Sequence, residues 1–150
     1  MSTASLRTGH VGINVTDVER STAFYRRVLG LDVVTEGTEE GRRFVFLGRD
    51  GALVLTLWQQ AGHAFEADRA GLHHLSFEVG SAEEVRAAEA VLRELGARFA
   101  YDGVVPHGEG TASGGIYFTD PDGTRLEIYA PTGAEGVAAP VAGAPTCGFF

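Results

Sequence analysis

Three residues of this chain carry side chains that bind metal ions and occupy matching places in a repeated pattern. His10 opens a β-rich segment, His74 opens a similar segment later in the chain, and Glu127 lies in a strand-like segment near the end. Imidazole nitrogens and carboxylate oxygens are common ligands of divalent transition metals. A single strand histidine is more often structural, but the joint placement of these three residues predicts a metal site.

The first half of the chain predicts the element order β-α-β-β-β. Segment 10–15 alternates as a strand does, and Thr16-Asp17 offers an N-cap for a helix over 18–29 that Gly30 ends. Three short strands separated by turn signals follow at 31–35, 43–47 and 53–58.

The second half repeats this order. Segment 74–79 opens with histidine and carries valine five positions later, as segment 10–15 does. A capping box over 81–84 precedes a helix at 85–95, which Gly96 ends. The remaining strands are expected at 99–101, 115–119 and 125–129, with a long loop at 102–113.

Self-similarity of this kind indicates duplication within one domain, residues 1–150. The Asp-Gly turns at 50–51 and 122–123 align at an offset of 72 residues. The expected parts are a first module at 9–60, a linker at 61–70, a second module at 71–130 and an irregular tail at 131–150. The tail is rich in Gly, Ala and Pro, and we expect a loose terminus; the alternative is that Phe149 and Phe150 dock on the body or on a second subunit.

Composition excludes several classes of protein. A net charge of −8 and a pI near 5.0 disfavour nucleic acid and anionic membrane surfaces as partners. All twelve basic residues are arginine, so Schiff-base and P-loop chemistry are excluded, and the single cysteine, Cys147, excludes an internal disulfide. No apolar run suits a signal peptide or a membrane span, so we expect a cytoplasmic protein.

Four segments resemble the vicinal oxygen chelate superfamily, which includes glyoxalase I, bleomycin resistance proteins and extradiol dioxygenases. They are His10 to Asp17, Ala23 to Leu31, His74 to Val79 and Tyr117 to Glu127, and they occur in the order of that family. The resemblance covers residues 9–130. It implies an α+β fold in which two βαβββ modules form an open, cup-like mixed sheet, the glyoxalase/dioxygenase fold.

The resemblance also implies roles for five residues. His10, His74 and Glu127 would be the metal ligands, a set that favours iron(II) and also accommodates Mn(II), Ni(II) or Zn(II). Tyr117 and His107 lie near positions at which extradiol dioxygenases carry a tyrosine and a histidine. Tyr117 is therefore a candidate for binding a substrate oxygen, and His107 is a candidate acid or base.

One position departs from part of the family. Glyoxalase I has a further ligand in the first module, and the offset of 72 places it at Leu55, whose side chain cannot bind a metal. This departure disfavours glyoxalase and epimerase chemistry.

We expect His73 on the strand face opposite to His74, because side chains alternate. Aromatic residues suited to a planar substrate are Phe44, Phe46, Trp58, Tyr101 and Tyr129.

We therefore expect a metal-dependent oxidoreductase of the extradiol dioxygenase type that acts on an aromatic vicinal diol. Two alternatives stay open. One is a bleomycin-resistance-type protein that sequesters an aromatic natural product, and the other is a metalloenzyme of the glyoxalase, lyase or isomerase type. The expected partners are a small aromatic molecule and a second copy of the chain in a homodimer.

Overall fold

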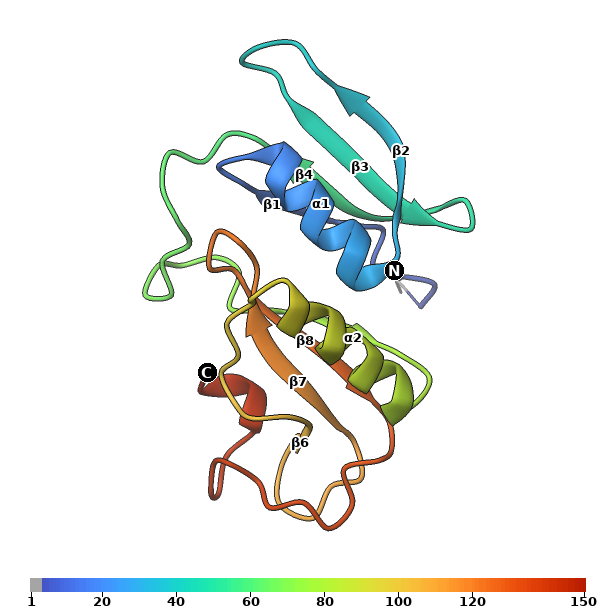
Figure 1. Ribbon diagram of the computed structural model, residues 1–150, viewed down its shortest axis with the longest axis vertical. Helices are drawn as coiled ribbons and strands as arrows, with labels where there is room; N and C mark the ends of the chain where they lie inside the picture. Colours follow the sequence, from blue (N-terminus) through green and yellow to red (C-terminus); the bar gives the residue numbers. More distant parts are fainter. Residues whose placement is uncertain (1–3) are drawn as a thin grey trace. The chain divides into compact units, whose positions relative to one another are not determined.

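The computed structural model describes residues 4–150, which divide into two compact units at residues 64 and 65. The division falls within the segment 61–70 that was expected to link the modules. Each unit contains a four-stranded mixed sheet with a helix on one face (Figure 1). The predicted α+β class with two βαβββ modules is therefore confirmed.

The first unit begins with a strand and a helix and continues with three strands. Its elements are β1 (Val11–Asn14), α1 (Val18–Leu29), β2 (Asp32–Gly37), β3 (Phe44–Arg49) and β4 (Ala52–Trp58). The strand order in the sheet is β1-β4-β3-β2, with β1 parallel to β4 and the other neighbours antiparallel.

Local signals set the limits of α1 as predicted. The Asp17 carboxylate accepts a hydrogen bond from the Arg20 amide at 3.0 Å, which satisfies one of the free amides of the first turn. At the other end Gly30 has φ of 63° and donates its amide to the Arg26 carbonyl at 3.0 Å. Glycine suits this left-handed position because it has no Cβ.

The second unit repeats the same topology. Its elements are β5 (Leu75–Glu78), α2 (Ala82–Glu94), β6 (Val105–Pro106), β7 (Gly114–Thr119), β8 (Arg125–Ala130) and a short 3-10 helix, η1 (Thr146–Gly148). The strand order is β5-β8-β7-β6, with β5 parallel to β8, as β1 is to β4. Duplication of the strand order accounts for the repeat seen in the sequence.

Two elements of the second unit differ from the expectation. The α2 helix begins three residues earlier than expected, because Ser81 accepts the Glu84 amide at 3.3 Å and caps the helix directly. The strand expected at 99–101 is reduced to one bridge, between Phe99 and Phe118. The edge strand β6 instead comes from the segment expected to be a loop.

Glycine explains where the edge strand forms. A Cβ on Gly114 would lie 2.4 Å from the Val105 carbonyl oxygen and 2.9 Å from the Pro106 Cα, so only glycine lets β6 approach β7 here. Proline is tolerated because β6 is at the edge of the sheet, where one side of the strand needs no amide donor.

Side chains of each sheet alternate between the face that packs on the helix and the opposite face, which we call the open face. The α1 helix packs on β3 and β4, and α2 packs on β7 and β8. The fully buried side chains of the central strands include Leu47, Leu55, Leu57, Ile116, Leu126 and Ile128.

Among residues 4–150, neither α1 nor α2 combines the length and the apolar character that a membrane-spanning helix needs.

The tail at 131–150 is largely irregular, but the expectation of a loose terminus is wrong. Ala134 and Thr146 are buried. The Ala134 amide donates to the Ala112 carbonyl at 3.0 Å, and the Thr146 amide donates to the His107 carbonyl at 2.8 Å. The Thr146 hydroxyl also donates to the Pro106 carbonyl at 2.6 Å. These long-range bonds hold the tail on the second unit.

The packing of α2 supplies the first prediction. Leu92 is 0 % exposed under α2, whereas Leu95, at the end of the same helix, is 37 % exposed. Leu92→Ala should lower the free energy of unfolding by about 2–5 kcal/mol, because it leaves a cavity in the core. Leu95→Ala should lower it by less than about 1 kcal/mol. Urea unfolding measures both values, and equal losses would contradict the described packing.

Candidate functional site

The second sheet places three polar residues in one row across its strands. Ser76 on β5 is paired with Glu127 on β8, and Glu127 is paired with Tyr117 on β7. The Ser76 hydroxyl donates to a Glu127 carboxylate oxygen, so these two side chains share one face. That face is the open face, because the neighbouring Leu126 and Ile128 belong to the helix-side core.

Glu127 is the centre of this row. The side chain is buried, with 3 % of the residue exposed, and its second carboxylate oxygen lies 3.2 Å from His107 Nε2. Burial by itself would raise the pKa of Glu127. Hydrogen bonding by His107 and Ser76, together with the nearby Tyr117 hydroxyl, outweighs burial and holds the pKa below its usual value. Glu127 is thus a carboxylate at neutral pH.

The Tyr117 hydroxyl is buried next to Glu127 without a regular hydrogen bond to any of the described residues. Burial, and then the adjacent Glu127 carboxylate, raise the pKa of Tyr117 far above its usual value. The phenol is therefore a neutral donor at all physiological pH values. A buried donor of this kind is available to an oxygen atom of a ligand.

His107 joins the row from the segment between β6 and β7. Its Nδ1 lies 2.8 Å from the Ser113 hydroxyl, and its ring lies 4.8 Å from the Tyr129 ring, centroid to centroid. The Tyr129 hydroxyl in turn donates to Glu78 at 2.7 Å. His107 is consequently oriented by Ser113 on one ring nitrogen and by Glu127 on the other.

His74 lies directly before β5 and is half-buried. Burial lowers the pKa of His74, as do His73 and Arg125, although the Glu127 carboxylate opposes the shift. The imidazole is neutral at pH 7, which is the form that binds a metal ion.

The expected orientation of His73 is wrong. Its Nδ1 lies 2.8 Å from the His74 Nδ1, so the two rings meet instead of pointing to opposite faces. The reason is that β5 begins at Leu75, and strand alternation does not apply to the two preceding histidines.

The structure thus gathers four of the five predicted residues, His74, His107, Tyr117 and Glu127, in the second unit. His10 belongs to the first unit, where it is exposed directly before β1, and its joining with the others stays a prediction. Within the described chain no group of three or more His, Cys, Asp or Glu side chains is arranged to hold a metal ion.

The first sheet has a corresponding row, and it corrects one expectation. Gly12 on β1 is paired with Thr56 on β4, and Thr56 with Phe46 on β3, as Ser76, Glu127 and Tyr117 are paired in the second sheet. The counterpart of Glu127 is therefore Thr56 and not Leu55. The offset of 72 fails because β4 carries a bulge after its tight turn, which shifts the strand register relative to the turn.

Aromatic side chains surround Thr56 on the open face of the first sheet. The Phe44 ring lies 5.3 Å from those of Phe46 and Trp58, and the latter two lie 5.6 Å apart. The Trp58 indole donates to the Thr56 hydroxyl at 2.9 Å. In the second unit Tyr101 packs on Tyr117, with ring centroids 5.5 Å apart. Both open faces are therefore suited to planar apolar groups.

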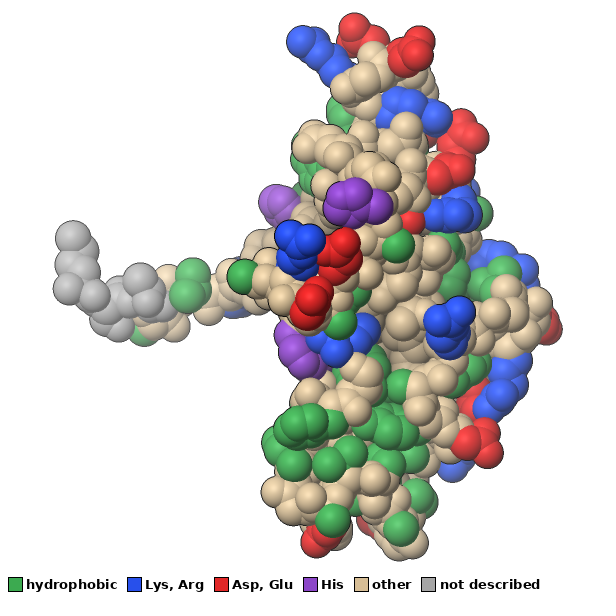
Figure 2. Space-filling view, turned by 90° about the vertical axis from the view of Figure 1, so that its left-hand side faces the viewer, with side chains coloured by type: hydrophobic (Ala, Val, Ile, Leu, Met, Phe, Trp, Pro, Cys, Tyr) green, Lys and Arg blue, Asp and Glu red, His purple; other side chains and the backbone are tan. Residues whose placement is uncertain are grey.

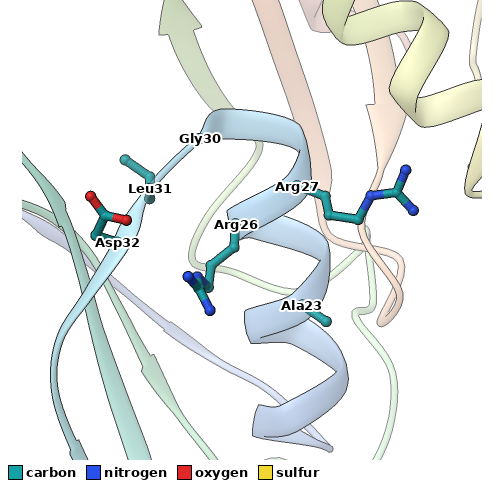
Figure 3. A pocket seen from close by; sticks show the side chains of 6 residues that line it. All are labelled: Ala23, Arg26, Arg27, Gly30, Leu31 and Asp32. Carbon is teal, nitrogen blue, oxygen red and sulfur yellow. The ribbon is translucent and has the colours of Figure 1, made fainter.

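A hollow at the end of α1 lies apart from these residues. It has a volume of about 410 Å³, and Figure 3 shows the side chains of Arg26 and Arg27 leaving the helix in different directions there. Asp32, the first residue of β2, and Leu31, directly before it, line the hollow as well. None of the predicted site residues lines it, so we do not assign it to the site.

Two residues were not predicted as part of the site from the sequence: Ser76, and Phe150, whose docking on the body was left open as an alternative. Ser76 could have been found, because it follows His74 by two positions and so shares the strand face expected for a ligand. Phe150, whose ring lies 5.7 Å from the His74 ring, has no local signal, because only the folded tail brings it there.

Comparisons with known proteins agree with this architecture. A catechol-2,3-dioxygenase of Bacillus subtilis is 29% identical over 125 residues, which are 81% of this chain, although the chain spans only 40% of that protein's length. A probable trivalent organoarsenical cleaving enzyme of Bacillus subtilis is 31% identical over 122 residues, covering 80% of this chain and 77% of that protein.

Solved structures show the same fold. A glyoxalase/bleomycin resistance protein/dioxygenase domain from Frankia sp. EAN1pec superposes with a TM-score of 0.70 at 25% identity, covering 83% of this chain and 97% of that one. The fosfomycin resistance protein of Listeria monocytogenes, solved with Mn(II) and sulfate, superposes with a TM-score of 0.62 at 20% identity, covering 88% and 98%. The family model matches residues 7–128, and the chain belongs to the Glyoxalase/Bleomycin resistance protein/Dioxygenase superfamily.

Proposed function

We propose that the protein is a metal-dependent enzyme of the extradiol dioxygenase type that acts on an aromatic vicinal diol. The observation that carries the proposal is the buried Tyr117 hydroxyl, which makes no regular hydrogen bond, beside a carboxylate that His107 and Ser76 hold in place. The relative named as a catechol-2,3-dioxygenase supports it.

The residues present fit a divalent metal ion. Glu127 supplies an anionic carboxylate and His74 a neutral imidazole, and His10 would complete the set of two histidines and one carboxylate. This donor set suits iron(II), which we favour, and also Mn(II), Ni(II) or Zn(II). When bound, such an ion would bind adjacent substrate oxygens and lower the energy of the ionised diol.

The surrounding residues would position the diol and move its proton. The Tyr117 hydroxyl would donate a hydrogen bond to one substrate oxygen, since it has no regular partner of its own. His107, fixed by Ser113 at Nδ1, would exchange a proton at Nε2 with the substrate or with water. The aromatic rings of Tyr101 and Tyr129, which border this face, would exclude water from the ring of the substrate.

A binding protein is the second candidate, and the first sheet favours it. The Phe44, Phe46 and Trp58 rings form a continuous aromatic surface around Thr56, and no carboxylate stands at the position equivalent to Glu127. Sequestration of an aromatic compound needs such a surface and no metal.

Chemistry of the lyase or isomerase type is a third candidate, supported by the organoarsenical cleaving relative.

Metal content separates these candidates. We expect the protein, purified without a metal-affinity tag, to hold about one iron or manganese per chain, and Glu127→Ala and His10→Ala to lose it, because each removes a ligand. His63→Ala, which alters an exposed histidine, should retain the metal and serves as the control. Elemental analysis measures the content. Absence of metal from all forms, even after anaerobic reconstitution, would favour the binding protein.

Loss of the Tyr117 hydroxyl should slow turnover without loss of metal. Tyr117→Phe should lower kcat for catechol cleavage by about a hundredfold, because a hydrogen-bond donor to the reacting oxygen is removed. Tyr25→Phe removes the hydroxyl of another buried tyrosine, in α1, and should leave kcat unchanged. Oxygen uptake with a catechol series measures both rates. An unchanged kcat in Tyr117→Phe would remove this residue from the reaction.

A further inference from the structure

The tail anchors itself on the open face of the second sheet through two hydrogen-bonded points. Thr146 is bonded through its amide and its hydroxyl to the main chain of His107 and Pro106. The Tyr101 hydroxyl lies 3.3 Å from the Thr146 carbonyl and 3.2 Å from the Phe149 carbonyl. Figure 2 shows hydrophobic side chains gathered on the second unit, on the side where the C-terminus lies in Figure 1.

Phe150 then turns its ring into the site. The ring centroid lies 4.9 Å from that of Tyr117 and 5.7 Å from that of His74, both in edge-to-face geometry. The Arg125 guanidinium carbon lies 5.7 Å from the same ring. We call the space between His74, Tyr117 and Arg125 the Phe150 pocket.

Arg125 is held in place to bind an oxygen acceptor. Its Nε donates to the His73 carbonyl at 2.9 Å, which fixes the guanidinium, and its Nη1 donates to the main-chain oxygen of Phe150 at 2.7 Å. No Asp or Glu side chain among residues 4–150 forms an ion pair with Arg125, so a ligand oxygen could reach the guanidinium without displacing a side-chain carboxylate. A guanidinium binds an anionic oxygen more strongly than a neutral one, so this position favours a ligand oxygen that carries charge.

Comparison with Phe149 shows that placement of a ring in the site is specific to Phe150. Phe149 carries the same side chain but is 66 % exposed, whereas the Phe150 ring contacts residues of the site. Gly148 precedes both, and a Cβ there would meet nothing within 4 Å. Rotation of the chain at Gly148 would release Phe150 while Thr146 stays bonded, at the cost of the hydrogen bond from the Tyr101 hydroxyl to the Phe149 carbonyl.

We infer that the Phe150 pocket is a binding site for an aromatic ring that carries an anionic oxygen, with Arg125 as the residue that selects the charge. The chain's own Phe150 competes with such a ligand for the pocket. The substrate class that the pocket indicates, an aromatic acid, rests on the proposed function. Binding of an aromatic anion in the pocket depends only on the contacts of Phe150.

The probe that matches these contacts is 3-phenylpropanoate, which reproduces the ring, the two-carbon spacing and the oxygen of Phe150. Two analogues separate its parts: 3-phenylpropanol keeps the ring without the charge, and propanoate keeps the charge without the ring. Calorimetric titration of the full-length, chelator-treated protein measures binding without metal or turnover. The variants are Phe150→Ala, its matched control Phe149→Ala, and the pair Arg125→Gln and Arg125→Lys.

We expect 3-phenylpropanoate to bind Phe150→Ala about tenfold more tightly than the unaltered protein, because the internal competitor is removed. Phe149→Ala should bind as the unaltered protein does. Arg125→Gln, introduced into Phe150→Ala, should weaken binding by about tenfold or more, and Arg125→Lys should restore part of it. Both analogues should bind more weakly than the probe.

Equal affinities in Phe150→Ala and Phe149→Ala, or no binding to either, would overturn the inference. Equal binding of 3-phenylpropanol and 3-phenylpropanoate would overturn the role of Arg125. A folding defect is recognised separately, by the thermal midpoint of each variant. A protein that binds the probe as expected but takes up no metal would contradict the proposed function alone, and a metal-loaded protein without this binding pattern would contradict the pocket alone.

A second readout follows the tail directly. In the amide spectrum of the uniformly labelled protein, saturation with 3-phenylpropanoate should move the Phe150 signal toward that of an unpacked residue, while the Thr146 signal stays in place. A Phe150 signal that does not respond to a bound probe would show that ring and probe do not share the pocket, and would overturn the competition.

Discussion

Burial of the Glu127 carboxylate is the interaction on which the second unit depends. A buried carboxylate is costly unless charge-assisted hydrogen bonds satisfy it. Ser76 and His107 supply them from β5 and from the segment before β7, so pairing of β5, β8 and β7 is a condition for the carboxylate to be tolerated. The sheet and its polar centre are therefore stabilised together, and the same hydrogen bonds keep the carboxylate charged at neutral pH.

The two units show how one topology can carry two chemistries. Both sheets have the same strand order and the same parallel pairing of their first and last strands. The row that holds Ser76, Glu127 and Tyr117 in one sheet holds Gly12, Thr56 and Phe46 in the other. The two sheets therefore differ in the residues of this one row. The row forms a charged, hydrogen-bonded centre in the second sheet and a neutral, aromatic one in the first. The core residues of the strands on the helix side are apolar in both units.

The tail has little regular secondary structure, but it is attached firmly to the second unit. Its Gly, Ala and Pro residues form little regular structure, yet Thr146 is fully buried and Phe150 is bonded to Arg125. Small residues allow the backbone to follow the contour of the sheet, and the few larger side chains provide the contacts. The arrangement places an aromatic ring of the chain against Tyr117, the residue whose hydroxyl has no regular partner.

Sequence alone determined the element order, both helices and their caps, and the polar residues of the second module. These features follow from short-range physics: side-chain periodicity, N-cap side chains such as Asp17 and Ser81, and glycine at positions of positive φ. Its errors at β6, His73 and Leu55 concern strand ends or register, which depend on the partner strand. Its error at the tail concerns long-range hydrogen bonds. Only the tertiary structure decided that Ser76, 51 residues away along the chain, hydrogen-bonds Glu127, and that Phe150 reaches Arg125 across 25 residues. Contacts between residues so distant along the chain produce no periodic pattern in the sequence, because they arise from the packing of strands and tail and not from local backbone preference.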